Sequence, residues 1–213
     1  MTVELVHVTP NAEELIVKMA RVSAPENESN METAPRLLRY LLKHGHVSPF
    51  EMANMCVEIN TTRAISAQII RHRSLSFQEY STRYSDVSKI GSPTVPHLRR
   101  QDLKNRQNSV DDLTADEVGA YYRRISQLFE DAEHLYRELV SNGVAKECAR
   151  SILPLATPTR LYANGTLRSW IHYIRLRESH GTQIEHQIIA KEIKAIFTEQ
   201  FPIIAEAAFD VLP

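Results

Sequence analysis

Apolar residues recur along this chain with the two periods that distinguish helices from strands. Helical spacing predicts helices over residues 11–22, 34–44, 63–70, 114–142, 144–153, 166–177 and 183–209. Alternation of apolar and polar residues predicts strands over residues 3–8, 53–61 and 157–163. The chain shows no internal repeat and no linker-like stretch, so we expect one domain over residues 1–213.

Several local signals predict where these elements end. Gly45 and Gly143 are expected to end the helices that precede them, and Thr114 with Glu117 forms a capping box. The pair Asn164-Gly165 is typical of a turn after the strand over 157–163. Pro202 is expected to interrupt the last helix.

The helix over 114–142 carries the longest apolar stripe. Its members are Val118, Tyr121, Ile125, Leu128, Phe129, Ala132, Leu135, Tyr136 and Leu139. We interpret the stripe as core or subunit interface. Residues 85–110 lack a clear period and are expected to form a long surface loop.

Composition excludes several classes of protein. Hydrophobic content of 43%, charged content of 24% and a net charge of −1 are typical of a soluble globular protein and argue against a general nucleic-acid binder. No apolar run approaches the roughly 20 residues that span a bilayer, and residues 1–10 lack the features of a signal peptide. We therefore expect a cytoplasmic protein without membrane contact.

The two cysteines, Cys56 and Cys148, carry little chemistry. Neither has a second cysteine at metal-binding spacing, so no metal site is expected, and a reducing compartment argues against a disulfide. The sequence contains neither of the glycine-rich phosphate-binding motifs, G-x-G-x-x-G and the P-loop. Any phosphate binding must therefore depend mainly on arginine and hydroxyl side chains.

Residues 68–84 concentrate the candidate chemistry. They contain Arg71, His72, Arg73, Glu79 and Arg83. Guanidinium groups donate paired hydrogen bonds to oxyanions, so this segment favours an anionic ligand such as a sugar phosphate. Gln68 and Arg71 share a face if the helix over 63–70 continues, and Glu79, Ser81 and Arg83 point the same way if their segment is extended. The alternative interpretation is a solvated basic helix followed by a polar edge strand.

A second group of cations lies on the helix over 166–177. Arg168, His172 and Arg175 are spaced at i, i+4 and i+7 and share one face, whereas Arg177 lies nearly opposite Arg168. One ligand is therefore not expected to touch both Arg168 and Arg177 in one subunit. Two ligands, or a pocket shared between subunits, fit this helix better.

The longer pattern resembles a known enzyme family. Arg71-His72-Arg73, seven further residues and then Ser81 match the signature of the flavin-dependent thymidylate synthases, with Glu79 and Arg83 in the family's positions. Residues 44–51 (HGHVSPFE) and 149–154 (ARSILP) are also similar to stretches of that family. The resemblance extends from Gly45 to Glu185.

The resemblance implies a reaction, a fold and an assembly. The reaction is reductive methylation of dUMP to dTMP, with methylenetetrahydrofolate as carbon donor and NADPH as the reductant of bound FAD. The fold is α+β, with helices packed around a small mostly antiparallel sheet. Such enzymes are homotetramers whose sites are shared between subunits.

The resemblance also assigns roles to individual residues. For FAD it implies His46, Ser48, Arg71, His72, Arg73, Glu79, Thr166, Arg168 and His172, although some relatives have Asn in place of Thr166 and His172. For dUMP it implies Gln68, Arg71, Glu79, Ser81, Arg83, Arg150 and Arg177. Arg177 is the expected catalytic residue, because its positive charge beside the uracil ring favours the base deprotonated at N3.

Two other classes of function stay open at this point. A nucleic-acid-binding module could use the basic region over residues 63–104, although the chain lacks an aromatic stacking array or a recognition-helix motif. A regulatory protein could keep the nucleotide pocket without the chemistry.

Overall fold

The computed structural model describes residues 1–209, which divide into two compact units. The first unit comprises residues 1–59, 72–77 and the chain from residue 162 onward. The second comprises residues 60–71 and 78–161. The expectation of a single domain over 1–213 stays a prediction.

A four-stranded sheet connects strands from distant parts of the sequence. Its order is β1-β2-β6-β3, with β1 at Thr2–Val8, β2 at Asn54–Thr62, β6 at Pro158–Thr166 and β3 at Ser76–Glu79. Backbone hydrogen bonds at the strand ends join opposite termini: Thr9 N to Asn54 O, Leu167 N to Ala53 O and Tyr80 N to Arg160 O, each 2.9 Å. These neighbours therefore run antiparallel. The predicted α+β fold with a small, mostly antiparallel sheet is confirmed.

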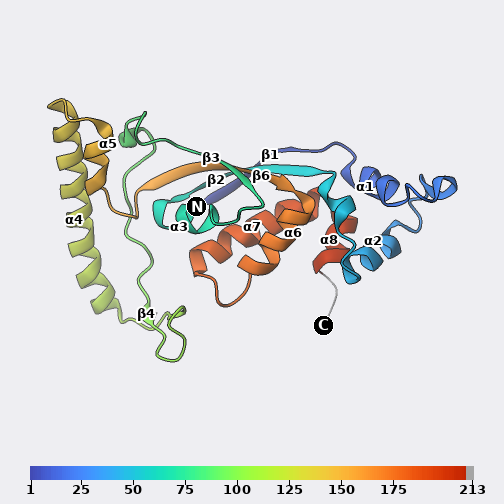
Figure 1. Ribbon diagram of the computed structural model, residues 1–213. Coiled ribbons are helices and arrows are strands. Elements are labelled where there is room, and N and C mark those ends of the chain that lie inside the picture. The colour runs from blue at the N-terminus through green and yellow to red at the C-terminus, as the bar shows by residue number, and fades with distance from the viewer. Residues whose placement is uncertain (210–213) are drawn as a thin grey trace. The chain divides into compact units, whose positions relative to one another are not determined.

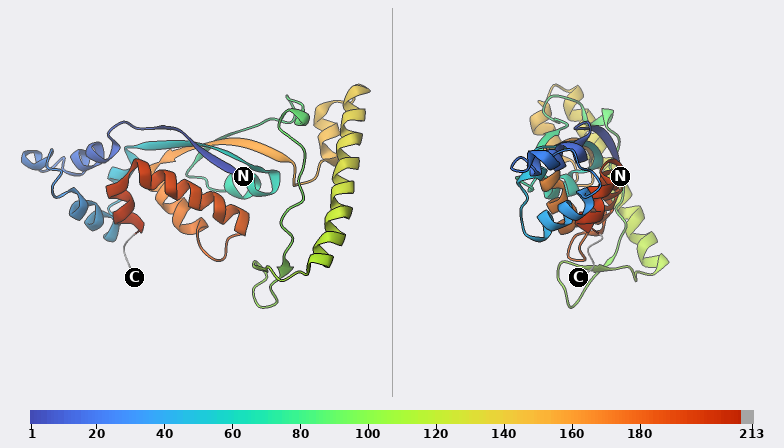
Figure 2. Two further views of the ribbon diagram at one scale, coloured as in Figure 1. Left: turned by 180° about the vertical axis from the view of Figure 1, so that it is seen from behind. Right: turned by 90° about the vertical axis from the view of Figure 1, so that its right-hand side faces the viewer.

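The first unit contains most of the buried aromatic core. Its helices are α1 (Ala12–Ala20), α2 (Ala34–Lys43), α6 (Leu167–Arg177), α7 (Ile184–Gln200) and α8 (Pro202–Phe209), with 3-10 turns at Pro25–Asn27 and Ser48–Glu51. Helices α6 and α7 pack side by side, and α2 packs against α8 (Figures 1 and 2). Trp170 is fully buried and donates from Nε1 to the Met55 carbonyl at 2.8 Å, which fastens α6 to β2. The break before Pro202 is as predicted.

The second unit is organised around one long helix. It contains α3 (Arg63–Ile69), α4 (Ala115–Ser141), α5 (Lys146–Ala149), 3-10 turns at Val87–Lys89 and Arg150–Ile152, and a hairpin of β4 (Arg100–Gln101) and β5 (Ser109–Val110). The capping box of Thr114 and Glu117 starts α4 as predicted.

The apolar stripe of α4 is only partly covered by the second unit. Tyr136 is the buried residue of the helix and packs with Val87 and Ala149. Tyr121, Tyr122, Leu128 and Leu135 are exposed, by 45–63%. These side chains are not core of the described chain, and a subunit interface at this part of the helix stays a prediction.

The predicted turn at Asn164-Gly165 is wrong, because β6 continues through both residues to Thr166. Gly165 has another function in the fold. A Cβ atom built on it would lie 2.2 Å from Cδ2 of the buried Leu75 side chain. Glycine at this position therefore allows the buried Leu75 side chain to approach β6 closely, and any larger residue would force that side chain to shift.

Two further expectations, one about residues 79–83 and one about Gln68 with Arg71, are not met. Strand β3 ends at Glu79, and residues 82–84 form a turn, so Glu79, Ser81 and Arg83 do not share one face of a strand. Helix α3 ends at Ile69, so Arg71 lies beyond it rather than on the face of Gln68. Residues 85–110 are mostly loop, as expected. They also contain a short 3-10 turn and the β4–β5 hairpin, whose two-residue strands are too short to give a period.

Replacing Gly165 tests this packing directly. We expect Gly165→Ala to lower the free energy of unfolding by roughly 1–3 kcal/mol, because Leu75 must leave its buried position. Urea denaturation followed by circular dichroism measures the change. The matched control is Gly119→Ala within α4, where the added Cβ makes only an ordinary contact at 3.7 Å with Arg123. That control is expected to be neutral or stabilising by up to about 1 kcal/mol, and equal effects in the two variants would contradict the packing argument.

Candidate functional site

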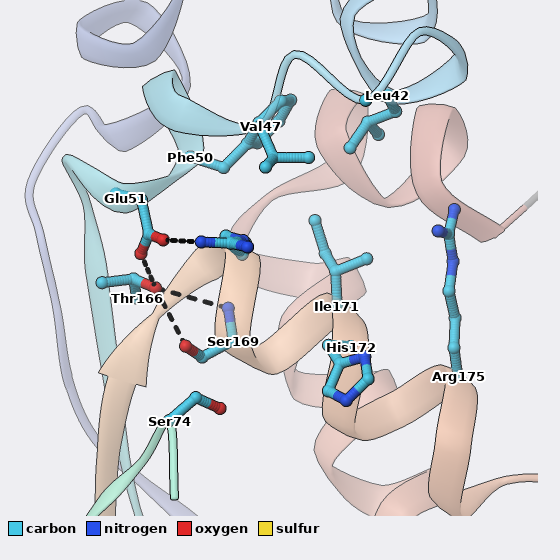
Figure 3. Close-up of a pocket in the computed structure, with 12 residues that line it drawn as sticks. Leu42, Val47, Phe50, Glu51, Ser74, Thr166, Ser169, Ile171, His172 and Arg175 are labelled. Atoms are coloured by element: carbon cyan, nitrogen blue, oxygen red, sulfur yellow. Dashed lines mark hydrogen bonds and ion pairs between the residues drawn. The ribbon is translucent and has the colours of Figure 1, made fainter.

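The first unit contains a pocket of about 710 Å³ beside the start of α6. Its walls come from the segment after α2, from the chain before β3 and from α6 (Figure 3). The lining residues are Leu42, Gly45, Val47, Phe50, Glu51, Ser74, Thr166, Arg168, Ser169, Ile171, His172 and Arg175. The pocket thus combines an apolar wall with several hydrogen-bond donors and two guanidinium groups.

Hydrogen bonds fix the junction between β6 and α6. Thr166 is the N-cap of α6, and its Oγ1 accepts from the Ser169 backbone N–H at 3.3 Å. Its hydroxyl donates to Oε2 of Glu51 at 2.7 Å, and Arg168 donates from Nη1 to Oε1 of the same carboxylate (Figure 3). The bonds from Thr166 and Arg168 lower the pKa of Glu51 below its usual value. Glu51 therefore stays ionised and holds both side chains at the pocket.

One face of α6 points into the pocket. Arg168, His172 and Arg175 all line it, as their i, i+4, i+7 spacing predicts. Arg175 donates from Nη2 to the Ala208 carbonyl at 2.7 Å, so its position depends on α8. Three of the predicted cofactor residues therefore line this pocket: Thr166, Arg168 and His172.

Arg177 faces a different direction, as predicted. Its Nε donates to Nε2 of His72 at 2.7 Å. Burial, the positive charge of Arg177 and the electrostatic interaction with His172 together lower the pKa of His72 to about 4. His72 is therefore neutral near pH 7 and accepts the bond from Arg177. The resemblance placed these two residues at different ligands, whereas the structure brings them into direct contact.

The donor set of this pocket suits a dinucleotide cofactor. Arg168, Arg175 and the hydroxyl of Ser74 can bind phosphate oxygens, while Val47, Phe50 and Ile171 offer an apolar surface to a ring system. His46 and Ser48 lie in the segment that forms one wall, and both side chains are exposed. Arg73, next to Ser74, is also exposed.

The second unit contains a smaller pocket, of about 440 Å³. It is lined by Ser81, Arg83, Tyr84, Ala145, Lys146 and Glu147. Arg83 pairs with Glu147 at 3.1 Å, and Lys146 donates to the Tyr84 carbonyl at 3.1 Å. Arg150 does not line the pocket but donates to Oγ1 of the buried Thr82 at 3.1 Å, which anchors the turn that carries Ser81 and Arg83. Ser81 and Arg83 were predicted, and the structure brings them together.

Glu79 lies apart from both pockets. Its Oε1 accepts from Ser66 at 2.6 Å and from Thr159 at 2.8 Å, and pairs with Arg63 at 3.2 Å. The structure thus gives Glu79 a role in joining α3, β3 and β6. Gln68 is half-buried on α3 and Arg71 is exposed just beyond it. The ligand contacts expected of these three residues stay predictions.

Among the pocket residues missing from the predicted set are Glu51, Ser74, Arg175, Tyr84 and Lys146. Glu51 ends the HGHVSPFE stretch and Arg175 completes the i, i+7 spacing with Arg168, so both had a usable signal in the sequence. The other three reach their pockets through tertiary packing. Among residues 1–209, no group of three or more His, Cys, Asp or Glu side chains is placed to hold a metal ion. In the same range no helix is long and apolar enough to cross a membrane.

The fold is shared with a nucleotide methylase. The crystal structure of the UMP/dUMP methylase PolB from Streptomyces cacaoi bound with 5-Br dUMP superposes with a TM-score of 0.86 at 29% sequence identity, covering 97% of this chain and 93% of that one. The complex of the same methylase with 5-Br UMP gives a TM-score of 0.84.

Sequence comparison specifies the family. The family described as thymidylate synthase complementing protein matches residues 4–203. A probable flavin-dependent thymidylate synthase of Paramecium bursaria Chlorella virus 1 is 50% identical over 196 residues, which are 92% of this chain and 90% of the relative. The flavin-dependent thymidylate synthase of Synechocystis sp. is 48% identical over 195 residues, which are 92% and 88% of the two chains. The chain therefore belongs to the thymidylate synthase complementing protein family, a family of enzymes, and the resemblance stated from its motifs is confirmed.

The buried histidines make a prediction about stability and pH. Burial lowers the pKa of both His72 and His186 to about 4. In the unfolded chain these histidines take up protons near pH 6.5, whereas in the folded chain they do so only near pH 4. Acidification from pH 6.5 towards pH 4 therefore favours the unfolded chain. The full stabilisation is present above pH 6.5. We expect the free energy of unfolding to fall by roughly 1–3 kcal/mol between about pH 7 and pH 5 from these groups.

Urea denaturation at several pH values measures this dependence. His186→Gln is expected to flatten it, whereas His134→Gln, which alters an exposed histidine on α4, is expected to leave it unchanged. Parallel pH profiles for all three proteins would show that the buried imidazoles take up protons as freely as exposed ones.

Proposed function

We propose that this chain is a flavin-dependent thymidylate synthase that converts dUMP to dTMP, with methylenetetrahydrofolate as carbon donor and NADPH as reductant. The observation that carries the proposal is the pocket of the first unit, in which guanidinium and hydroxyl donors face an apolar wall. The names of the two relatives at 48–50% identity support the same reaction.

FAD is the proposed cofactor of the first pocket. Arg168 and Arg175 would bind its phosphates. His172 lies between them on α6, and Thr166 caps the start of that helix. Val47 and Phe50 would cover an apolar part. When bound and reduced by NADPH, FAD would supply the hydride that goes to the pyrimidine. The protein's contribution is orientation, exclusion of water and electrostatic stabilisation.

The proposed site for the phosphate of dUMP is the second pocket. Arg83 and Lys146 give it two cations, and Ser81 adds a hydroxyl. Glu147 is the present partner of Arg83, and an incoming phosphate would compete for that guanidinium. Arg150 acts on this site through Thr82, whose turn it holds.

Arg177 is the proposed catalytic residue. Its guanidinium would lie beside the uracil ring and stabilise negative charge that develops when N3 loses its proton. Its Nε is already bonded to neutral His72, so the remaining N–H donors have a defined orientation. The charge is permanent at any physiological pH.

A regulatory protein without chemistry is the competing function, and a tritium assay separates the two. The purified protein is expected to show flavin absorbance and to release tritium from 5-labelled dUMP only when NADPH and methylenetetrahydrofolate are both present. Nucleotide binding without tritium release would favour the regulatory alternative. Colourless protein that takes up no added FAD would contradict the proposal.

Two arginine variants distinguish the two pockets. Arg168→Gln is expected to weaken FAD binding, and Arg83→Gln to raise the dUMP KM at saturating FAD, each by about ten- to a hundredfold, because each loses a charge-assisted hydrogen bond. Fluorescence titration of FAD and initial-rate kinetics measure the two effects. Arg106→Gln, on the exposed part of the chain near the hairpin, is the control and is expected to change neither. If Arg83→Gln acted on FAD and Arg168→Gln on dUMP, the assignment of the pockets would be reversed.

The proposal includes a homotetramer with sites shared between subunits. The exposed side chains Tyr121, Leu128 and Leu135 of α4 support it, because such an apolar stripe on one helix is typical of an interface. Leu128→Glu is expected to shift the molar mass measured by light scattering towards the monomer. Gln127→Glu, an exposed neighbour on the same helix, introduces the same charge and is expected to preserve the tetramer. A Leu128→Glu protein of unchanged mass would place the interface elsewhere.

A further inference from the structure

Three buried polar aromatic residues and one half-buried arginine form a cluster where the chain at His72 meets α6 and α7. Its members are His72, Tyr173 and Arg177 with His186 from α7. Tyr173 and His186 have no exposed surface, and His72 is 6% exposed. The proposed cofactor and nucleotide contacts do not account for Tyr173 or His186.

The first link of the cluster joins His72 to Arg177. Nε of Arg177 lies 2.7 Å from Nε2 of His72 and donates to it, so that ring nitrogen must be unprotonated. The guanidinium is planar, and a bond at Nε therefore fixes the direction of both terminal nitrogens. Any rotation or displacement of the His72 ring changes where those terminal nitrogens point.

The second link holds the His72 ring. Tyr173 packs its ring edge-to-face against His72, with centroids 4.8 Å apart at 69°. Tyr173 and Arg177 are four residues apart on α6, so both reach His72 from the same face of one helix. His172 also faces this ring, with centroids 6.3 Å apart.

The third link fixes Tyr173 itself. Its hydroxyl and Nε2 of His186 are joined by a hydrogen bond of 3.0 Å, which ties α6 to α7 inside the core. Burial raises the pKa of Tyr173 well above its usual value, so the phenol stays protonated. A buried Tyr–His pair costs more to desolvate than an apolar pair of the same size. Its hydrogen bond is directional, however, and therefore fixes the position of the Tyr173 ring in a way that an apolar contact does not.

We propose that the Tyr173–His186 pair is a positioning element that holds His72 and, through His72, orients the guanidinium of Arg177. The inference rests on the proposed function in that Arg177 acts on the pyrimidine. Neither Tyr173 nor His186 is assigned a contact with a substrate, so their effect on the rate is expected to be indirect.

The kinetic test compares tyrosine variants in the FAD-loaded enzyme. Tyr173→Phe keeps the ring that packs on His72 but removes the hydroxyl, and we expect kcat to fall by about tenfold while the dUMP KM changes by less than about twofold. His186→Gln is expected to give a similar loss. The double variant is expected to be no slower than the slower single variant, because both changes break one link.

The matched control is Tyr136→Phe in α4. Tyr136 is buried like Tyr173, and its hydroxyl accepts a hydrogen bond from the Val87 backbone N–H at 3.4 Å. It therefore reports the effect of removing a buried phenol hydroxyl away from the cluster. We expect its kcat and dUMP KM to match the wild type. Tyr173→Phe with wild-type kcat, or an additive loss in the double variant, would overturn the proposal.

A spectroscopic arm keeps the test independent of catalysis. In protein with 15N-labelled histidine and arginine, the wild type is expected to show His72 neutral with Nε2 unprotonated and a slowly exchanging Arg177 Nε–H. Tyr173→Phe is expected to speed that exchange, and Tyr136→Phe is not. If the wild type formed no dTMP, the proposed reaction would fail while this arm still decided the positioning role. Unchanged Arg177 exchange in Tyr173→Phe would overturn it.

Discussion

The direct junction between β6 and α6 is the constraint on which the candidate site depends. Thr166 ends the strand and caps the helix, and Glu51 holds the Thr166 hydroxyl at 2.7 Å, so the helix has to begin at Leu167. Successive residues of an α-helix are rotated by about 100°, and a fixed start therefore fixes the direction of every side chain that follows. Arg168, His172 and Arg175 face the pocket as a result, while Tyr173 and Arg177 face His72. A junction one residue longer or shorter would rotate both faces by about 100°, away from the pocket and away from His72.

Strongly periodic segments of this chain were predictable from sequence. The helix expected over 114–142 is Ala115–Ser141, because its capping box is a local interaction between Thr114 and Glu117. The shared direction of Arg168, His172 and Arg175 was also predictable, because it depends only on their spacing within one helix. Ser81 and Arg83 were also identified, although for a turn rather than for the extended strand that their alternation indicated.

The rest depended on contacts between distant residues. Asn164-Gly165 has the composition of a turn, but the glycine is needed because Leu75, 90 positions earlier in the chain, packs where its Cβ would lie. The sequence around Glu79 indicated a ligand-binding carboxylate. In the structure its partners are Ser66, Thr159 and Arg63 of the same chain. The buried part of the α4 stripe cannot be identified from its period, because Tyr136 and Leu135 both belong to the stripe and yet Tyr136 is buried while Leu135 is exposed. Local propensity carries no information about such partners.

The pairing of Arg168 with Glu51 has a consequence for how strongly the first pocket can hold an anion. The guanidinium already has an internal counter-ion, so its side chain is ordered before any ligand arrives. An entering anion would replace the Glu51 carboxylate as the partner of Arg168. The free energy of binding would then contain only the difference between the Arg168–anion pair and the Arg168–Glu51 pair. Under the proposed function, the diphosphate of a dinucleotide would have to compete with Glu51 for this guanidinium. The carboxylate would therefore reduce the net free energy that any anion gains from Arg168 and would help to keep its binding reversible.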